Sequence, residues 1–184
     1  MAAHYKGNTW IAGYNPLNEP TDEKQTRVVD FYDRIYKAIR AIDPDHILFF
    51  DGNTYASDFS HFGDVVLTWK NTAFSIHDYS VFGFPASPEK YASSEAQLRH
   101  LRRSYEKKRE WLDERGLCVW NGEWGPVYAR REYDGDKTDQ INDERLLVLR
   151  DQLDIYDKVS WSRSRNILTS ITTICLSVFH ARID

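Results

Sequence analysis

Residues 14–20 read Tyr-Asn-Pro-Leu-Asn-Glu-Pro and place one carboxylate, Glu19, just after an apolar run. The preceding residues 9–14 favour sheet structure, and the proline that follows the glutamate is a break signal. Taken alone, an Asn-Glu-Pro triplet is more typical of a turn or a helix start. The pattern recurs where residues 117–121 favour a strand and are followed by Gly-Glu-Trp-Gly-Pro at 122–126. We therefore predict two strands, each with a glutamate at its carboxyl end.

Two carboxyl groups that project from rigid elements into one cleft suit glycoside hydrolysis. One of them protonates the departing sugar oxygen, and the other attacks or stabilises the anomeric carbon. Glu19 and Glu123 are the candidates for this pair. The nucleophile has to stay ionised near neutral pH, whereas the acid has to stay protonated, so the two groups need different surroundings.

A third motif, Phe-Ser-Ile-His-Asp-Tyr at residues 74–79, lies between the two glutamates. The alternation of a strand places His77 and Tyr79 on one face and Asp78 on the other. One interpretation is a histidine and a tyrosine that are satisfied by local hydrogen bonds. The other is a pair that faces the same cleft as the glutamates, and the order of the three motifs favours it.

Three segments have the apolar spacing of helices, namely residues 27–41, 94–115 and 140–158. The second of them is rich in basic residues, but acidic residues are interleaved with these, which indicates a solvated face rather than a nucleic-acid surface. Strand and helix signals alternate along the chain. This order predicts the α/β class with a parallel sheet.

The composition is that of a globular chain with a hydrophobic core: 184 residues, 41% hydrophobic and 28% charged, with a net charge of −4. We predict neither nucleic acid nor a membrane as a partner, because no segment reaches the about 18 apolar residues of a membrane span. No signal peptide is recognisable at the N-terminus, so a soluble chain is predicted and its localisation stays unknown. Cys118 and Cys175 lack metal-ligand spacing, and only His77 among the histidines lies in a motif, so no metal or cofactor is predicted.

The three motifs occur in the order, and at the strand ends, found in glycoside hydrolase family 5, the cellulase family of retaining (β/α)8 barrels. The chain resembles this family over residues 1–162. Residues 47–55 also resemble the family's fifth strand and the loop that follows it. An extracellular location is common in the family.

The resemblance implies a role for each motif residue. Glu19 would be the acid/base and Glu123 the nucleophile of a retaining double displacement. Asn18 would hydrogen-bond the sugar 2-hydroxyl, Tyr79 would support the nucleophile, and His77 would line the sugar site. The implied activity is hydrolysis of a β-linked glucan or a related β-glycoside, so the implied partner is an oligo- or polysaccharide.

Two tryptophans complete the set of candidate substrate-binding residues. Trp124 follows the nucleophile candidate directly and is a candidate stacking platform for a sugar ring, although packing is the simpler interpretation. Trp161 matches the platform tryptophan at the start of the family's eighth strand, which the resemblance places at residues 159–162.

The resemblance covers only part of a barrel, so we predict an incomplete (β/α)8 TIM-barrel type with about strands four to seven and their helices. Residues 163–184 form a C-terminal tail without resemblance to the family. The bare edges of an incomplete parallel sheet favour self-association. Three possibilities remain open: a glycosidase, which as this chain alone would have low or no activity, an inactive carbohydrate-binding fragment, and a truncated gene product without function.

Overall fold

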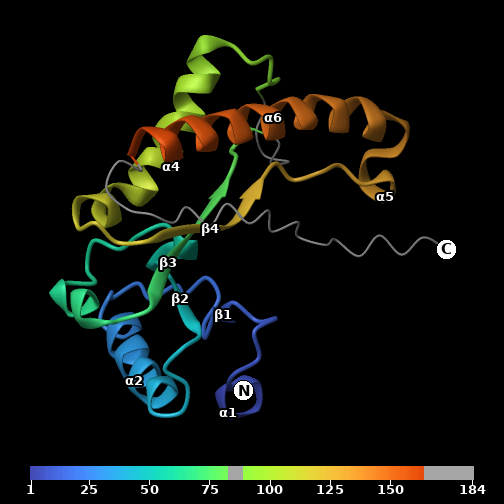
Figure 1. The fold of residues 1–184 in the computed structure, drawn as a ribbon. Helices are drawn as coiled ribbons and strands as arrows, with labels where there is room; N and C mark the ends of the chain where they lie inside the picture. Colours follow the sequence, from blue (N-terminus) through green and yellow to red (C-terminus); the bar gives the residue numbers. More distant parts are fainter. Residues whose placement is uncertain (83–88, 164–184) are drawn as a thin grey trace. The chain divides into compact units, whose positions relative to one another are not determined.

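The structure, a computed structural model, describes the backbone of residues 1–82 and 89–163 and the side chains up to residue 159 (Figure 1). Four strands lie in this part of the chain: β1 (Gly13–Tyr14), β2 (Ile47–Asp51), β3 (Thr72–Tyr79) and β4 (Val119–Gly125). The longer helices are α2 (Val28–Arg40), α4 (Glu95–Glu114) and α6 (Thr138–Arg163). Short helical segments are α1 (Ala2–Tyr5), α3 (Asn53–Ala56), η1 (Asp64–Thr68), α5 (Arg131–Asp134) and η2 (Gly135–Lys137). Residues 164–184 of the predicted tail lie outside the described residues.

The four strands form one sheet in the order β1-β2-β3-β4, which is also their order along the chain. β1 pairs with β2 and β2 with β3 in parallel, and the register places Asp51 opposite Ser75. The Phe74 amide donates a hydrogen bond to the Cys118 carbonyl over 2.8 Å and joins β3 to the beginning of β4. Parallel strands separated by helices confirm the α/β class and the incomplete TIM-barrel type. In such folds the functional side chains lie at the carboxyl ends of the strands.

The described chain divides into two compact units. The N-terminal unit contains Met1–Asp78 and Glu106–Gly122, and the C-terminal unit contains Tyr79–Tyr105 and the chain from Glu123 onward. Both β3 and β4 pass from the first unit to the second near their carboxyl ends.

Aromatic side chains form much of the core within each unit. In the N-terminal unit, the ring of Tyr32 on α2 lies 4.6 Å from that of Phe50 on β2, and the Tyr32 hydroxyl donates to the Asp51 carbonyl over 3.0 Å. In the C-terminal unit, the rings of Tyr105 on α4 and Tyr156 on α6 lie 4.5 Å apart. These contacts fix helices against the strands or helices that neighbour them in the same unit.

The predicted helices at 27–41 and 94–115 are confirmed to within one residue at each end by α2 and α4. The strand predicted at residues 9–14 is wrong over its first four residues, because only Gly13 and Tyr14 are in β1. Asn8 forms a turn there: its carbonyl accepts from the Ile11 amide, and its side chain accepts from the Trp10 amide over 3.0 Å. This local turn competes with the strand for the same backbone groups.

Two predicted boundaries near the C-terminal half are also wrong. β4 begins two residues later than expected, because the Leu117 amide bonds to the carbonyl of Leu112 at the end of α4. β4 also extends to Gly125, so Glu123 lies inside the strand rather than after it. The strand predicted at residues 159–162 is instead the last turn of α6, which extends to Arg163. A helix satisfies its backbone groups internally, whereas a strand needs a neighbouring strand.

A buried polar cluster joins β1 to the loop before β2. The Asp43 carboxylate, with no exposed surface, accepts from the Tyr14 hydroxyl and contacts His46 Nδ1, both over 2.7 Å. The second ring nitrogen of His46 lies 3.0 Å from the Asn8 carbonyl. Both partners of the imidazole are acceptors, so the doubly protonated ring satisfies both contacts. The bond to the Asn8 carbonyl and that to Asp43 raise the pKa of His46, against the opposing effect of burial.

We expect this cluster to make stability depend on pH. A histidine whose pKa is raised on folding stabilises the chain fully below its unfolded pKa of about 6.5, and this contribution is lost as pH rises through the folded value. The free energy of unfolding should therefore fall as pH rises above about 6.5, as measured by urea denaturation. His46→Gln should flatten this dependence, and the exposed-site control His4→Gln should not. An unchanged slope in His46→Gln contradicts the assignment.

Candidate active site

Glu19 lies in the loop after β1 and has an unusual backbone conformation. Its φ angle is +46°, in the left-handed region that non-glycine residues rarely adopt. Holding such a residue there costs about 1–3 kcal/mol, and strained residues of this kind cluster at active sites. The Glu19 amide donates to Asp51 Oδ2 over 2.9 Å, and the Leu17 amide donates to the Asn15 side chain. The two amides that donate these bonds lie between Pro16 and Pro20, so the loop is fixed between its two prolines.

His77 on β3 is the partner of the Glu19 side chain. It is 5% exposed, and its Nδ1 lies 2.8 Å from Glu19 Oε1. Its Nε2 lies 3.6 Å from Asp51 Oδ2, so the ring stands between two carboxylates. The neighbouring Asp78 instead accepts from Lys108 of α4 over 2.6 Å. These contacts agree with the predicted alternation of His77 and Asp78 between the two faces of the strand.

Gly122 allows β4 to lie close to this histidine. A Cβ atom at Gly122 would lie 2.7 Å from the Ser75 hydroxyl oxygen and 3.3 Å from His77 Nε2. Contacts under 3.0 Å force one of the partners to move. A methyl group at Gly122 would therefore displace the Ser75 hydroxyl, and it would press on His77 Nε2 by a few tenths of an ångström.

In the C-terminal unit, Tyr79 and Glu123 form the second contact between motif residues. The Tyr79 hydroxyl donates to Glu123 Oε2 over 2.9 Å, and Tyr79 is 37% exposed. The amide of Ser80 donates to the Gly125 carbonyl, which joins the carboxyl ends of β3 and β4 next to this pair. The Tyr79 phenol therefore fixes the direction of one oxygen of the Glu123 carboxylate.

The remaining predicted site residues are placed as follows. Asn18 is exposed beside Glu19. Trp124 is half-buried, and its ring meets that of Tyr156 on α6 edge-on at 5.4 Å, so part of its surface is used in packing within the C-terminal unit. Trp161 lies on the last turn of α6, and its side chain is outside the described part of the chain.

Asp51 and Asn15 lie near Glu19, and no role was predicted for either of them from the sequence. Asp51 is fully buried at the end of β2 and accepts from the Asn15 side chain over 2.8 Å. The sequence carried a signal for Asp51, because it is a carboxylate at the end of an apolar strand, as Glu19 and Glu123 were expected to be. The signal for Asn15, a polar residue directly after β1, is weaker.

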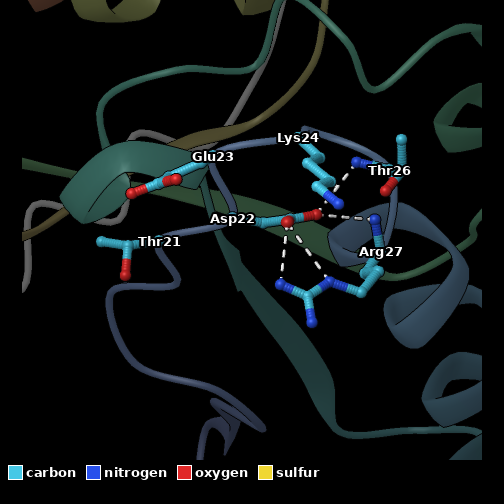
Figure 2. A pocket seen from close by; sticks show the side chains of 6 residues that line it. All are labelled: Thr21, Asp22, Glu23, Lys24, Thr26 and Arg27. Atoms are coloured by element: carbon cyan, nitrogen blue, oxygen red, sulfur yellow. Dashed lines mark hydrogen bonds and ion pairs between the residues drawn. The ribbon is translucent and has the colours of Figure 1, made fainter.

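A polar surface pocket follows Glu19 along the chain (Figure 2). Its centre is Asp22, which is 5% exposed and accepts from the amides of Thr26 and Arg27 and from the Arg27 guanidinium. These bonds lower the pKa of Asp22 to about 2, and the bond from the Arg27 side chain has the largest effect. The Asp22 backbone also exchanges two hydrogen bonds with the Asn53 side chain. The pocket is therefore organised around an ion pair that fixes the loop after Glu19 and the start of α2.

In residues 1–82 and 89–163 no helix is both long enough and apolar enough to cross a membrane.

The chain matches the family model for cellulase (glycosyl hydrolase family 5) over residues 1–163. The chain belongs to glycoside hydrolase family 5, and the resemblance noted in the sequence is confirmed.

The chain is similar to a protein named beta-xylosidase from Phanerodontia chrysosporium, with 73% identity over 164 residues. The match covers 88% of this chain and 34% of the relative, so the chain spans about a third of that protein's length. Among solved structures, it is similar to a hyperthermophilic endo-beta-1,4-glucanase in complex with substrate (TM-score 0.61, 18% identity, 79% of this chain and 48% of that chain). A second is the Clostridial cellulose synthase subunit Z from Clostridioides difficile (TM-score 0.67, 14% identity, 86% of this chain and 54% of that chain). At these identities the two structures support the barrel-type fold alone.

Proposed function

We propose that the chain carries the catalytic carboxyl pair of a retaining β-glycoside hydrolase, with Glu19 as acid/base and Glu123 as nucleophile. The observation that supports this most directly is that each motif glutamate contacts a motif residue of β3, Glu19 with His77 and Glu123 with Tyr79. The two contacts differ in chemistry, as the two roles require.

The Tyr79 hydroxyl supports the nucleophile because it donates to the ionised carboxylate of Glu123. In the first step, a Glu123 oxygen bonds to the anomeric carbon as the glycosidic C–O bond breaks, and the proton of Glu19 passes to the departing oxygen. In the second step, Glu19 takes a proton from water, and the water oxygen displaces Glu123 from the sugar. Atoms and charges balance over the two steps without a cofactor.

The contact with His77 orients the acid/base. It uses one carboxyl oxygen of Glu19, Oε1, so the side chain is held in one direction while Oε2 serves the proton transfer. As the family resemblance implies, Asn18, exposed beside Glu19, would bind the sugar 2-hydroxyl, and His77 and Trp161 would line the sugar site. Trp124 would add a stacking platform because it directly follows Glu123.

The proposed substrate class is a β-linked glucan or a related β-glycoside. One relative is named beta-xylosidase and a structural neighbour is an endo-beta-1,4-glucanase in complex with substrate. Both names concern β-linked sugars, and the higher identity of the first makes aryl β-xylosides the first compounds to assay, with β-glucans beside them.

The proposal is tested by trapping the covalent intermediate. A completed chain, in which residues 1–162 replace the matching segment of the longer relative, is incubated with a 2-deoxy-2-fluoro-β-glycoside that carries an activated leaving group. We expect the mass of one sugar to be added to the peptide that contains Glu123, and the first-formed hydrolysis product to keep the β configuration by NMR. Label on another residue, or an inverted product, overturns the proposal.

Gly122→Ala is expected to lower kcat/KM of the completed chain by up to about 10-fold, because a shift of His77 by a few tenths of an ångström disturbs the contact that orients Glu19. The measurement is aryl glycoside hydrolysis. The double variant Ser75→Ala/Gly122→Ala should recover part of the loss, since it removes the oxygen that the new methyl group would meet first. Ser75→Ala alone is the matched control. Full activity in Gly122→Ala contradicts the expected role of this glycine.

A further inference from the structure

The carboxylate of Asp51 stands at the centre of the loop and strand residues that surround Glu19. Its Oδ1 accepts from the Asn15 side chain over 2.8 Å, and its Oδ2 accepts from the Glu19 amide over 2.9 Å. Oδ2 also lies 3.6 Å from His77 Nε2. All these elements belong to the N-terminal unit. One fully buried carboxylate thus faces the backbone of the acid/base candidate and also the histidine that contacts its side chain.

We propose that Asp51 is the positioning residue of the acid/base: it holds Glu19 in its left-handed conformation and orients His77 against it. This inference deepens the proposed function and rests on the assignment of Glu19 as acid/base. Asp51 would not touch the substrate, and it acts through Glu19 and His77.

The backbone of Glu19 supports this role. A φ of +46° persists in a non-glycine residue only where the surroundings fix it, and the hydrogen bond from the Glu19 amide to Asp51 is charge-assisted. The Asn15 side chain also ties the start of the loop to β2, because it donates to Asp51 and accepts from the Leu17 amide. Loss of the Asp51 carboxylate would therefore release the loop and the direction of the Glu19 side chain together.

The position of His77 supports the role as well. Asp51 Oδ2 lies 3.6 Å from His77 Nε2, and Glu19 Oε1 lies 2.8 Å from the other ring nitrogen, so the two carboxylates together set the orientation of the imidazole. Asp51 itself is anchored from the opposite side, because the buried Tyr32 hydroxyl donates to its backbone carbonyl over 3.0 Å. The carboxylate thus connects the rigid core of the unit to the residues around Glu19.

Two variants test whether the hydrogen bonds of Asp51, rather than an aspartate at this position, hold Glu19. In Asp51→Asn, one side-chain oxygen becomes an NH2 group, so one of the two donors, Asn15 or the Glu19 amide, faces another donor. In the swap Asn15→Asp/Asp51→Asn, the new carboxylate at position 15 accepts from the new amide at position 51, whose oxygen still accepts from Glu19. Asp43→Asn is the matched control, because Asp43 is an equally buried, hydrogen-bonded carboxylate that contacts Tyr14 and His46 instead.

In the 184-residue chain, the readout is the Glu19 amide in ¹H–¹⁵N NMR spectra and its hydrogen exchange. We expect Asp51→Asn to shift this signal upfield and to lower its protection, because the Glu19 amide then faces the new NH2 group or competes with Asn15 for the one remaining oxygen. The swap should restore both, and Asp43→Asn should leave both unchanged. A Glu19 amide that keeps its shift and protection in Asp51→Asn overturns the inference, as does equal loss in Asp43→Asn.

In the completed chain, the readout is kcat/KM on aryl β-glycosides with poor and good leaving groups. In Asp51→Asn, kcat/KM should fall about 30-fold or more on phenyl glycosides, whose leaving group needs protonation. On dinitrophenyl glycosides, which need little protonation, it should fall less than about 3-fold. The swap should recover most of the lost kcat/KM. For Asp43→Asn we expect equal losses on both substrates, as a merely destabilising change gives. Equal losses on both substrates in Asp51→Asn overturn the inference. Glu19→Ala is assayed in parallel. If the loss in Glu19→Ala does not depend on the leaving group, the proposed function is wrong. If the loss depends on the leaving group in Glu19→Ala but not in Asp51→Asn, only the role of Asp51 is wrong.

Discussion

Glu123→Gln in the completed chain is expected to lower kcat at least about a thousandfold on every β-glycoside, a loss of about 4 kcal/mol or more in transition-state stabilisation. The amide keeps the size of the side chain but cannot bond to the anomeric carbon as a carboxylate does. The assay is release of reducing sugar from a soluble β-glucan and of phenol from aryl β-glycosides. Glu132→Gln, at an exposed glutamate of the same unit, is the control and should retain activity.

The loss in Glu19→Ala should depend on the leaving group. Activated aryl glycosides need little protonation, so the variant should keep partial activity on them while it loses polysaccharide hydrolysis. Glu23→Ala, at an exposed glutamate in the same loop, controls for changes in the loop itself. Equal losses from the Glu19 and Glu123 variants on all substrates contradict the division of roles between the two residues.

The second large effect concerns the chain on its own. We expect the 184-residue chain to have at most about a thousandth of the kcat/KM of the completed chain, a difference of roughly 4 kcal/mol. The match covers 34% of the longer relative, and in a (β/α)8 barrel several strands contribute residues to one site. A misplacement of about 1 Å can cost 10²-fold, and water in an open site weakens each charge interaction.

This comparison uses release of reducing sugar, with the Glu123→Gln variant as background. Size-exclusion chromatography accompanies it, because β1 and β4 are the outer strands of the described sheet and we propose that such edges favour self-association. Activity of the 184-residue chain close to that of the completed chain contradicts the expectation.

Elements with strong local signals were predictable from the sequence. α2 has a regular apolar stripe and was found to within one residue at each end, and β2 lies within residues 47–55, the segment that resembles the family's fifth strand and its loop. The wrong strand predictions have local causes that the hydrophobic pattern does not reveal. Asn8 turns the chain back with side-chain and backbone hydrogen bonds, and the turn after α4 occupies Leu117. In α6, the helix continues through residues that resemble a strand in the family.

The motif residues that form the candidate site could be named from the sequence, because their types and order are specific. The contacts that hold them were not. The left-handed backbone of Glu19, and the three groups that converge on Asp51, depend on the register of β2 against β3 and on the path of the loop after β1. These are tertiary features, and no pattern within a single strand encodes them.

The distance between the Glu19 and Glu123 carboxyl groups in a crystal structure of the completed chain tests the central claim most directly. A retaining pair predicts a separation of roughly 5–6 Å, with both groups facing the same sugar site. A separation beyond about 9 Å, or carboxyl groups that point away from each other, would contradict the assignment of these two glutamates as the catalytic pair.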